Sequence, residues 1–366
     1  MHLLEPREHP SELMKWLSPV IALVAMLIVG SLLFFILGVP PLQALYVFFI
    51  EPLTSTYSLS ELVIKASPLI LIALGLAVGF RAKLFNIGAE GQLTMGAIFG
   101  GGIAILFHNQ IGFWIMPLMI VMGAIGGAVW GLIPALLKTH FNAEETLTTL
   151  MMNYIAVFIL LYLVNGPWRD PDGMNFPQSV MFGESTTLSY LIEGTRINSS
   201  IFLTIFAVII FWFFIRKSLT AFKLEVSGQA PLAAKYAGFS SSKAVWLSLG
   251  ISGLMAGIAG ICEVAGPIGQ LNPNISPGYG YAAIIVAYLG RLNPLGIVLS
   301  GFLIALIYLG GEMAQMQLQL PVAITGIFQG LLLFFLLASD ALIENRYRFA
   351  KKKVKHSSNH SNENLA

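Results

Sequence analysis

The chain has 366 residues, of which 56% are hydrophobic and only 10% are charged, and its formal net charge at pH 7 is +2. A soluble domain carries about a quarter charged residues, so this composition excludes a water-soluble globular protein and makes lipid the main solvent of the surface. Several apolar runs reach the roughly 20 residues that a bilayer-spanning helix requires. The sequence therefore predicts an all-α polytopic membrane protein.

The reactive residues of the chain exclude several classes of site. The single cysteine, Cys262, rules out an internal disulfide framework and a cysteine-rich metal site. The six histidines are scattered without an H-E-x-x-H motif, and no G-x-x-x-x-G-K-[ST] loop is present. No nucleophile with a matching base is visible either. We therefore expect no enzyme, no bound metal and no cofactor on this chain.

Ten membrane spans are predicted. The first, 19–39, lacks a cleavage site and is too long for a signal-peptide core, so we expect it to be a retained anchor. We expect a cytoplasmic N-terminal segment (1–18), one transmembrane domain (19–340) and a basic and polar cytoplasmic tail (341–366) that is disordered after Tyr347. In chain order, the ten spans are 19–39, 62–80, 84–107, 112–137, 146–165, 201–215, 244–262, 279–290, 295–311 and 322–339.

The basic residues orient these spans. With the N-terminus in the cytoplasm, seventeen of the 20 lysines and arginines fall in cytoplasmic segments, and only Lys65, Arg169 and Arg196 fall outside. Such an excess marks cytoplasmic loops. The sequence thus predicts both termini in the cytoplasm, a long extracytoplasmic loop at 166–200 and a long cytoplasmic loop at 216–243.

A polar stretch, L-F-N-I-G-A-E-G-Q-L at 84–93, opens the third span with Asn86, Glu90 and Gln92. Glu90 is expected about 10 Å beyond the interfacial Arg81, where a carboxylate must face protein or water and is a functional candidate. Two interpretations stay open. Asn86 caps the helix start while Glu90 bonds backbone amides or Arg81, or these side chains line a solute path.

A second stretch, N-I-S-P-G-Y-G at 274–280, resembles the first but begins on the outside. Interrupted helices in corresponding positions of an inverted repeat mark the binding region of many transporters. Mid-span Asn153 and Tyr154 either bond neighbouring helices or line the path. The candidate path residues are Asn86, Glu90, Gln92, Asn153, Tyr154 and Asn274.

The cytoplasmic loop contains a predicted short helix at 229–236. Pro231 suits a first helical turn, and Gly238 is placed to end the helix. The segment is either an ordinary connection or a surface knob whose small residues let it dock closely in a partner's groove.

Four motifs together resemble a known family. They are F-N-I-G-A-E-G-Q-L, then E-T-L-T-T-L-M-M-N-Y-I-A at 145–156, G-Q-A-P-L-A-A-K-Y-A-G-F at 228–239 and S-G-L-M-A-G-I-A-G at 252–260. In this order they are similar to permease subunits of bacterial ABC importers of the ribose, simple-sugar and branched-chain amino acid superfamily. The nucleoside and simple-sugar branch matches best, over about residues 15–340.

The resemblance implies a type II importer-like permease of the bacterial cytoplasmic (inner) membrane, working by alternating access. It implies a second permease subunit, an extracytoplasmic binding protein or lipoprotein, and a separate ATPase subunit that binds the ATP, which fits the missing P-loop. No nucleic acid partner is implied. Carried over to this sequence, the coupling helix that contacts the ATPase comprises Gly228, Ala230, Ala233, Ala234, Tyr236, Ala237 and Gly238.

Alternatives remain at this point. The few charges inside the spans favour an uncharged polar solute such as a nucleoside or simple sugar, whereas a branched-chain amino acid would ask for paired charges in the path. An ion-coupled secondary transporter would need several midplane acids, and only Glu90 comes near. The solute and the identity of the second permease stay open.

Overall fold

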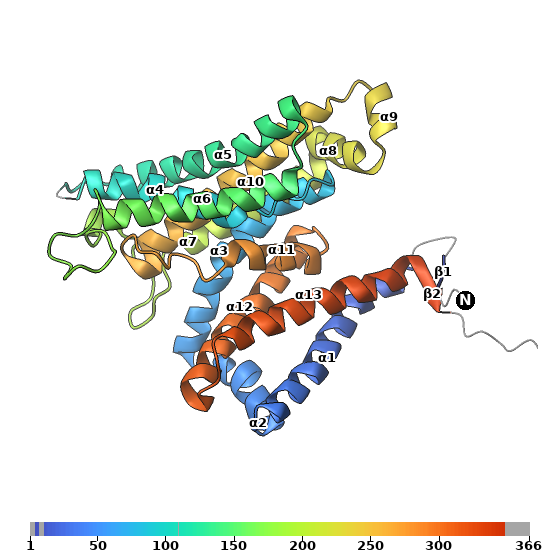
Figure 1. Ribbon diagram of the computed structural model, residues 1–366, viewed down its shortest axis with the longest axis horizontal. Coiled ribbons are helices and arrows are strands. Elements are labelled where there is room, and N and C mark those ends of the chain that lie inside the picture. Colours follow the sequence, from blue (N-terminus) through green and yellow to red (C-terminus); the bar gives the residue numbers. More distant parts are fainter. Residues whose placement is uncertain (1–3, 7–10, 109, 348–366) are drawn as a thin grey trace, which may run out of the picture. The chain divides into compact units, whose positions relative to one another are not determined.

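The structure is a computed structural model, which describes residues 4–6, 11–108 and 110–347 (Figure 1). It divides into two compact units. The small unit comprises Met1–Leu27 and Leu332–Ala366, and the large unit comprises Ile28–Leu331. All candidate site residues lie in the large unit.

The described chain is mainly helical. The α-helices are α1 (Glu12–Ile36), α2 (Pro41–Leu45), α3 (Thr56–Arg81), α4 (Ala89–Leu106), α5 (Ile115–Phe141), α6 (Glu145–Asn165), α7 (Ser200–Lys217), α8 (Leu219–Gln229), α9 (Pro231–Tyr236), α10 (Ser241–Glu263), α11 (Tyr279–Leu289), α12 (Pro294–Leu318) and α13 (Ala323–Glu344). Two π-helical turns (Tyr46–Ile50 and Val264–Ile268) and two 3₁₀ turns (Glu51–Leu53 and Glu184–Thr186) connect them.

Eight helices in the described part of the chain are long and apolar enough to cross a membrane: α1, α3, α5, α6, α7, α10, α12 and α13. Each of the ten predicted spans coincides with a helix of the structure. The remaining two predicted spans coincide with α4, which begins with polar residues, and with α11, whose 11 residues form a helix too short to cross a bilayer. The prediction of a polytopic helical protein is confirmed.

The small unit contains a short β-ribbon that we did not expect from the sequence. Strand β1 (Leu4–Pro6) pairs antiparallel with strand β2 (Asn345–Tyr347). In the same unit, the hydroxyl group of buried Ser18 lies 2.7 Å from that of Ser339 and donates to Asp340. The predicted disordered tail beyond residue 347 lies outside the described residues.

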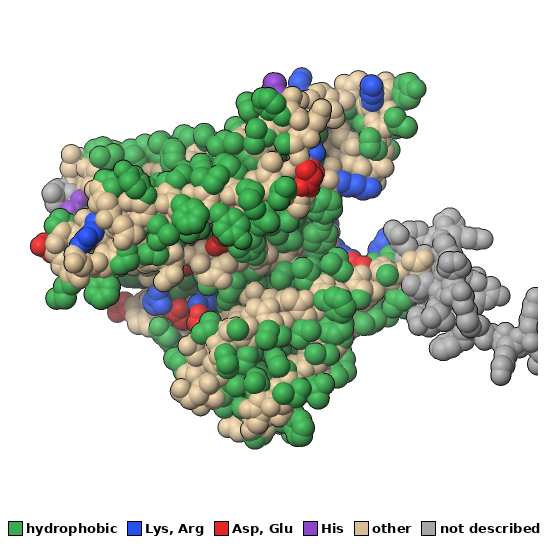
Figure 2. Space-filling view, in the orientation of Figure 1, with side chains coloured by type: hydrophobic (Ala, Val, Ile, Leu, Met, Phe, Trp, Pro, Cys, Tyr) green, Lys and Arg blue, Asp and Glu red, His purple; other side chains and the backbone are tan. Residues whose placement is uncertain are grey.

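Helix α3 is the innermost span of the large unit. Within its apolar window 89% of the residues are buried, against 33% for α5 and for α6. Helix α10 packs against α3, α4 and α5, and these helices meet at glycines. A Cβ atom on Gly257, for instance, would collide with the carbonyl oxygen of Gly123. Because only a third of the residues in the apolar windows of α5 and α6 are buried, these two helices expose apolar side chains, which are green in Figure 2.

One end of the large unit collects basic side chains. Figure 2 shows lysines and arginines around α8 and α9. The opposite end carries the loop 166–200, which hydrogen bonds along the segment after α10: Ser179 N donates to Leu271 O (2.9 Å) and Leu188 N to Ala265 O (2.8 Å). The basic residues at the α8–α9 end are Arg81, Lys83, Lys138, Arg216, Lys217, Lys223, Lys235, Lys243 and Arg291.

Candidate functional site

The first turns of α4 and α11 touch. Gly280, in α11, lies so close to Glu90, in α4, that a Cβ atom on the glycine would collide with the Glu90 backbone. From this point α4 runs away from the α8–α9 end, and α11 runs toward it. The two stretches that the sequence singled out as counterparts, 84–93 and 274–280, thus meet in space at two helix starts. We call this contact the junction.

The Glu90 carboxylate caps the start of α11. Its Oε2 atom accepts a hydrogen bond from the Gly280 amide at 2.7 Å. The residue is 9% exposed. A helix N-terminus carries partial positive charge from its unsatisfied amides, and here one carboxylate serves two such ends. Of the two interpretations, the geometry favours capping, but of α11 rather than of α4 alone, and without Arg81.

Asn86 and Gln92 join the junction to α10. Asn86 Oδ1 accepts from the amide of Gly88, the residue just before α4, at 2.8 Å. Its Nδ2 donates to Gln92 Oε1 (3.0 Å) and to Ser252 Oγ on α10 (2.8 Å). Asn86 and Gln92 are each 1% exposed. Both amides thus satisfy buried partners, as a helix break inside a membrane requires.

Asn153, on α6, hydrogen bonds to residues at both helix starts of the junction. Its Oδ1 accepts from the Gly91 amide (2.8 Å), which is one of the unpaired donors of the α4 first turn. Its Nδ2 donates to Ile87 O (2.9 Å) and to the Tyr281 hydroxyl (3.0 Å). Interhelical hydrogen bonding, one of the two roles considered for Asn153, is what the structure contains.

Two other predicted path residues lie outside the junction. Tyr154 is 56% exposed on α6. Asn274 is exposed in the loop before α11, where its amide bonds Asn272 Oδ1 at 2.8 Å. The structure adds one residue that the sequence did not single out. Tyr281 is 40% exposed and bonded to Asn153. A tyrosine in an apolar run gives little signal, and only its place just after 274–280 pointed to it.

Arg81 links the far end of α11 to α8. The side chain, at the end of α3, forms an ion pair with Glu225 of α8 (Nη1 to Oε2, 3.2 Å). Its Nε and Nη2 donate to the carbonyl of Leu292, in the turn after α11, at 3.3 and 3.0 Å. Gly228 of α8 packs on the same helix end, where a Cβ atom would lie 2.7 Å from Arg81 O. Helix α11 is therefore held at its start by Glu90 and beyond its end by Arg81.

The surface helix predicted at 229–236 is present as α9, but it begins at Pro231, because Gln229 is the last residue of α8. Gly238, with φ +75°, ends it, and the Phe239 amide bonds Ala234 O at 2.9 Å. Tyr236 is 93% exposed, whereas Ala234 is 3% exposed. Of the seven residues assigned to the coupling helix, Ala230, Ala233, Tyr236, Ala237 and Gly238 face outward, and Gly228 and Ala234 face the protein. The exposed set forms a small, mostly apolar knob.

Ion pairs join helices at the opposite end of the large unit. Lys65 of α3 pairs with Glu312 of α12 at 2.8 Å, and Glu61 of α3 pairs with Arg196 at 3.3 Å. Glu263 lies nearby and is 8% exposed. Among the described residues, no group of three or more His, Cys, Asp or Glu side chains is arranged to hold a metal ion.

Comparisons with known proteins place the chain in a family. The family model for the permease component of the branched-chain amino acid transport system matches residues 58–337. The glucose ABC transporter permease protein TsgB13 of Haloferax volcanii is 32% identical over 355 residues, covering 94% of this chain and 92% of its own. The guanosine ABC transporter permease protein NupP of Bacillus subtilis is 29% identical (93% and 96% covered), and the nucleoside ABC transporter permease protein NupB of Lactococcus lactis is 28% identical (81% and 84%). The chain is therefore a multi-pass membrane protein that belongs to the permease family of branched-chain amino acid transport systems.

Proposed function

We propose that this chain is the membrane permease subunit of an ATP-driven ABC importer for nucleosides or related simple sugars. Similar permeases are named for glucose, guanosine and nucleosides. The observation that carries the solute class is the junction, whose polar groups are amides, hydroxyls and backbone, with one carboxylate already bonded to a helix start. A zwitterionic amino acid would need a pair of opposite charges there.

We infer that ten segments cross or enter the membrane, with both termini and the α8–α9 end in the cytoplasm. The nine basic residues at that end support this orientation, because lysine and arginine accumulate on the cytoplasmic side. Helices α4 and α11 are then the two interrupted spans, and their helix starts meet inside the membrane. The predicted inverted repeat remains a proposal.

We propose that α9 is the contact for a separate ATPase subunit, which binds the ATP, while this chain itself catalyses no reaction. A second permease subunit, of the same or a related sequence, and an extracytoplasmic binding protein or lipoprotein complete the assembly. The exposed face of α9 supports this contact, since Tyr236 and Leu232 are 93% and 76% exposed. Small neighbours such as Ala233 allow a partner to approach closely.

We propose that the solute path runs beside the junction, along exposed Tyr281 and the nearby Tyr154. The buried set Asn86, Glu90, Gln92 and Asn153 would keep the helix break open, and Asn274 would lie toward the extracytoplasmic entrance. ATP binding would pull α9, and Arg81 would pass that movement to α11. Alternating access then amounts to a shift of α11 against α4 at the junction.

The α9 assignment predicts loss of the ATPase subunit on disrupting the exposed face. Replacing Ala233 and Ala237 with glutamate buries two charges in the docked contact, and we expect co-purification of the ATPase to fall at least tenfold. Ser242→Glu, exposed but off α9, is the control and should leave co-purification intact. Unchanged co-purification of the double variant would refute the assignment.

Buried Ala234 is not a suitable target for this experiment. It is 3% exposed and faces the protein, so a charge there would disturb folding as well as docking. A comparison limited to exposed positions separates the two effects.

A further inference from the structure

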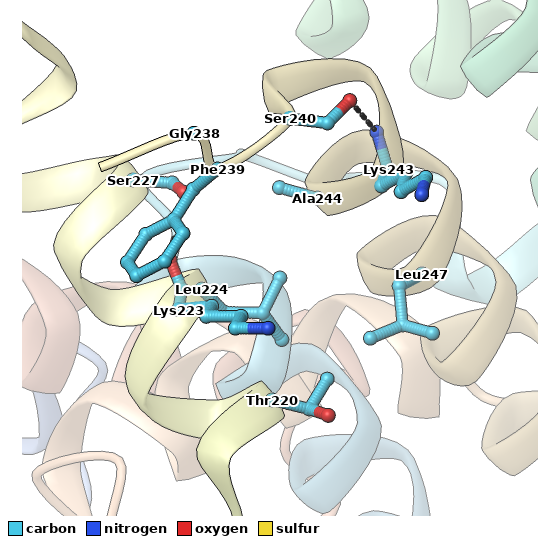
Figure 3. Close-up of a pocket in the computed structure, with 10 residues that line it drawn as sticks. All are labelled: Thr220, Lys223, Leu224, Ser227, Gly238, Phe239, Ser240, Lys243, Ala244 and Leu247. Atoms are coloured by element: carbon cyan, nitrogen blue, oxygen red, sulfur yellow. Dashed lines mark hydrogen bonds between the residues drawn. The ribbon is translucent and has the colours of Figure 1, made fainter. Parts of the chain in front are cut away.

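A pocket of about 320 Å³ lies beside α9, between α8 and the first two turns of α10 (Figure 3). The turn after α9 closes one end of it. Two of its lining residues are lysines, three carry hydroxyl groups and none is acidic. They are Thr220, Lys223, Leu224, Ser227, Gly238, Phe239, Ser240, Lys243, Ala244 and Leu247.

The two lysines come from opposite walls. Lys223 extends from α8 beneath the Phe239 ring, with its ammonium nitrogen 5.5 Å from the ring centroid, and Lys243 lies on the first turn of α10 (Figure 3). Neither forms an ion pair with any residue that the structure describes. The nearest acid along α8, Glu225, is bonded to Arg81 (3.2 Å) and Gln229 (3.0 Å). Two lysines in the lining of one pocket, neither with an ion-pair partner among the described residues, favour an anionic ligand.

Ammonium and hydroxyl groups line the pocket, and one of the hydroxyls, that of Ser227, already donates to Lys223 O at 2.7 Å. Ser240 Oγ already accepts from the Lys243 amide at 3.3 Å, so its hydroxyl proton is left to donate outward. The lining of the pocket thus contains two lysines and this hydroxyl, and no carboxylate. Such a set matches the several acceptor oxygens of a phosphate group.

The other part of the pocket wall is apolar. Leu224 and Ala244 are buried there, and Leu247 is 38% exposed. Next to the lining residues of α8 in the sequence, Leu219 and Phe222 are 73% and 57% exposed. A free phosphate ion makes no favourable contact with an apolar wall, whereas a phospholipid carries acyl chains close to its phosphate.

We propose that this pocket binds the phosphate group of an anionic phospholipid of the leaflet on the α8–α9 side. The lysines and Ser240 hold the headgroup, and Leu247 with the exposed face of α8 contacts the acyl chains. The proposal does not depend on the transported solute. It places a lipid directly against the segment that joins α9 to α10.

Native mass spectrometry of the full-length purified protein tests the proposal. Short-chain phosphatidylglycerol, phosphatidylcholine and inorganic phosphate are titrated separately. We expect phosphatidylglycerol to bind at least tenfold more tightly than either alternative. Lys223→Gln and Lys243→Gln should each weaken its binding about fivefold, and the double variant roughly 25-fold.

The control removes the same charge elsewhere at the same end. Lys217 and Lys235 are exposed and do not line the pocket, so the double variant K217Q/K235Q should weaken phosphatidylglycerol binding less than twofold. Equal weakening by both double variants would overturn the proposal, because it would indicate only general surface charge. Inorganic phosphate binding as tightly as phosphatidylglycerol would overturn the lipid source, and unaltered binding by K223Q/K243Q would overturn the site.

Discussion

Glu90→Ala is expected to destabilise the protein by about 3 kcal/mol and to abolish transport. The substitution leaves the Gly280 amide, bonded at 2.7 Å in the wild type, without an acceptor in a buried place. An unsatisfied buried donor costs about 1–3 kcal/mol, and the carboxylate also stabilises two helix N-termini. Glu90→Gln should recover only part of the loss, because its NH₂ group would face amide donors.

Thermal unfolding in detergent, with uptake measured on the same preparation, checks this. The apparent unfolding temperature should fall by about 5 °C for the alanine variant. Glu312→Gln is the matched control, since it removes a carboxylate whose side chain is 47% exposed, and it should shift unfolding by less than about 1 °C. Normal stability of Glu90→Ala with lost uptake would instead show that Glu90 contacts the solute.

Arg81→Gln is expected to uncouple ATP hydrolysis from transport. The variant keeps the exposed face of α9, so the ATPase should still co-purify. It loses the donors to Leu292 O, at 3.0 and 3.3 Å, and the ion pair with Glu225. If movement of α8 reaches α11 through this side chain, uptake should fall about tenfold or more while ATP hydrolysis persists.

The ratio of solute taken up to ATP hydrolysed, in reconstituted vesicles, is the measurement. Lys83→Gln removes an exposed charge two residues away and should leave the ratio unchanged. The exchange R81E/E225R should not restore it, because Leu292 O would still lack its donor at position 81. Full uptake by Arg81→Gln would show that the link through α11 is wrong.

Much of the fold follows from sequence, because long apolar runs bounded by charges become helices in a membrane. The ends of α9 follow from Pro231 and Gly238, each of which suits one helix end. The polar residues of the junction were also identifiable, since Asn86, Glu90 and Asn153 have to find partners inside the membrane.

The partners themselves could not be predicted. Glu90 and Gly280 are 190 residues apart, and a backbone amide carries no mark in the sequence. Arg81 looked like an interfacial anchor, and its bond to the Leu292 carbonyl depends on where the turn after α11 folds. The short α2 and the pairing of β1 with β2 were missed because three to five residues give no usable periodicity.

Uptake into proteoliposomes that contain this chain, its ATPase and its second permease tests the central claim most directly. With the binding protein outside and ATP on the ATPase side, labelled guanosine or glucose should accumulate, ionophores should have no effect, and leucine should not compete. Accumulation that persists without the ATPase and collapses with an ion gradient, or that only leucine abolishes, would contradict the account.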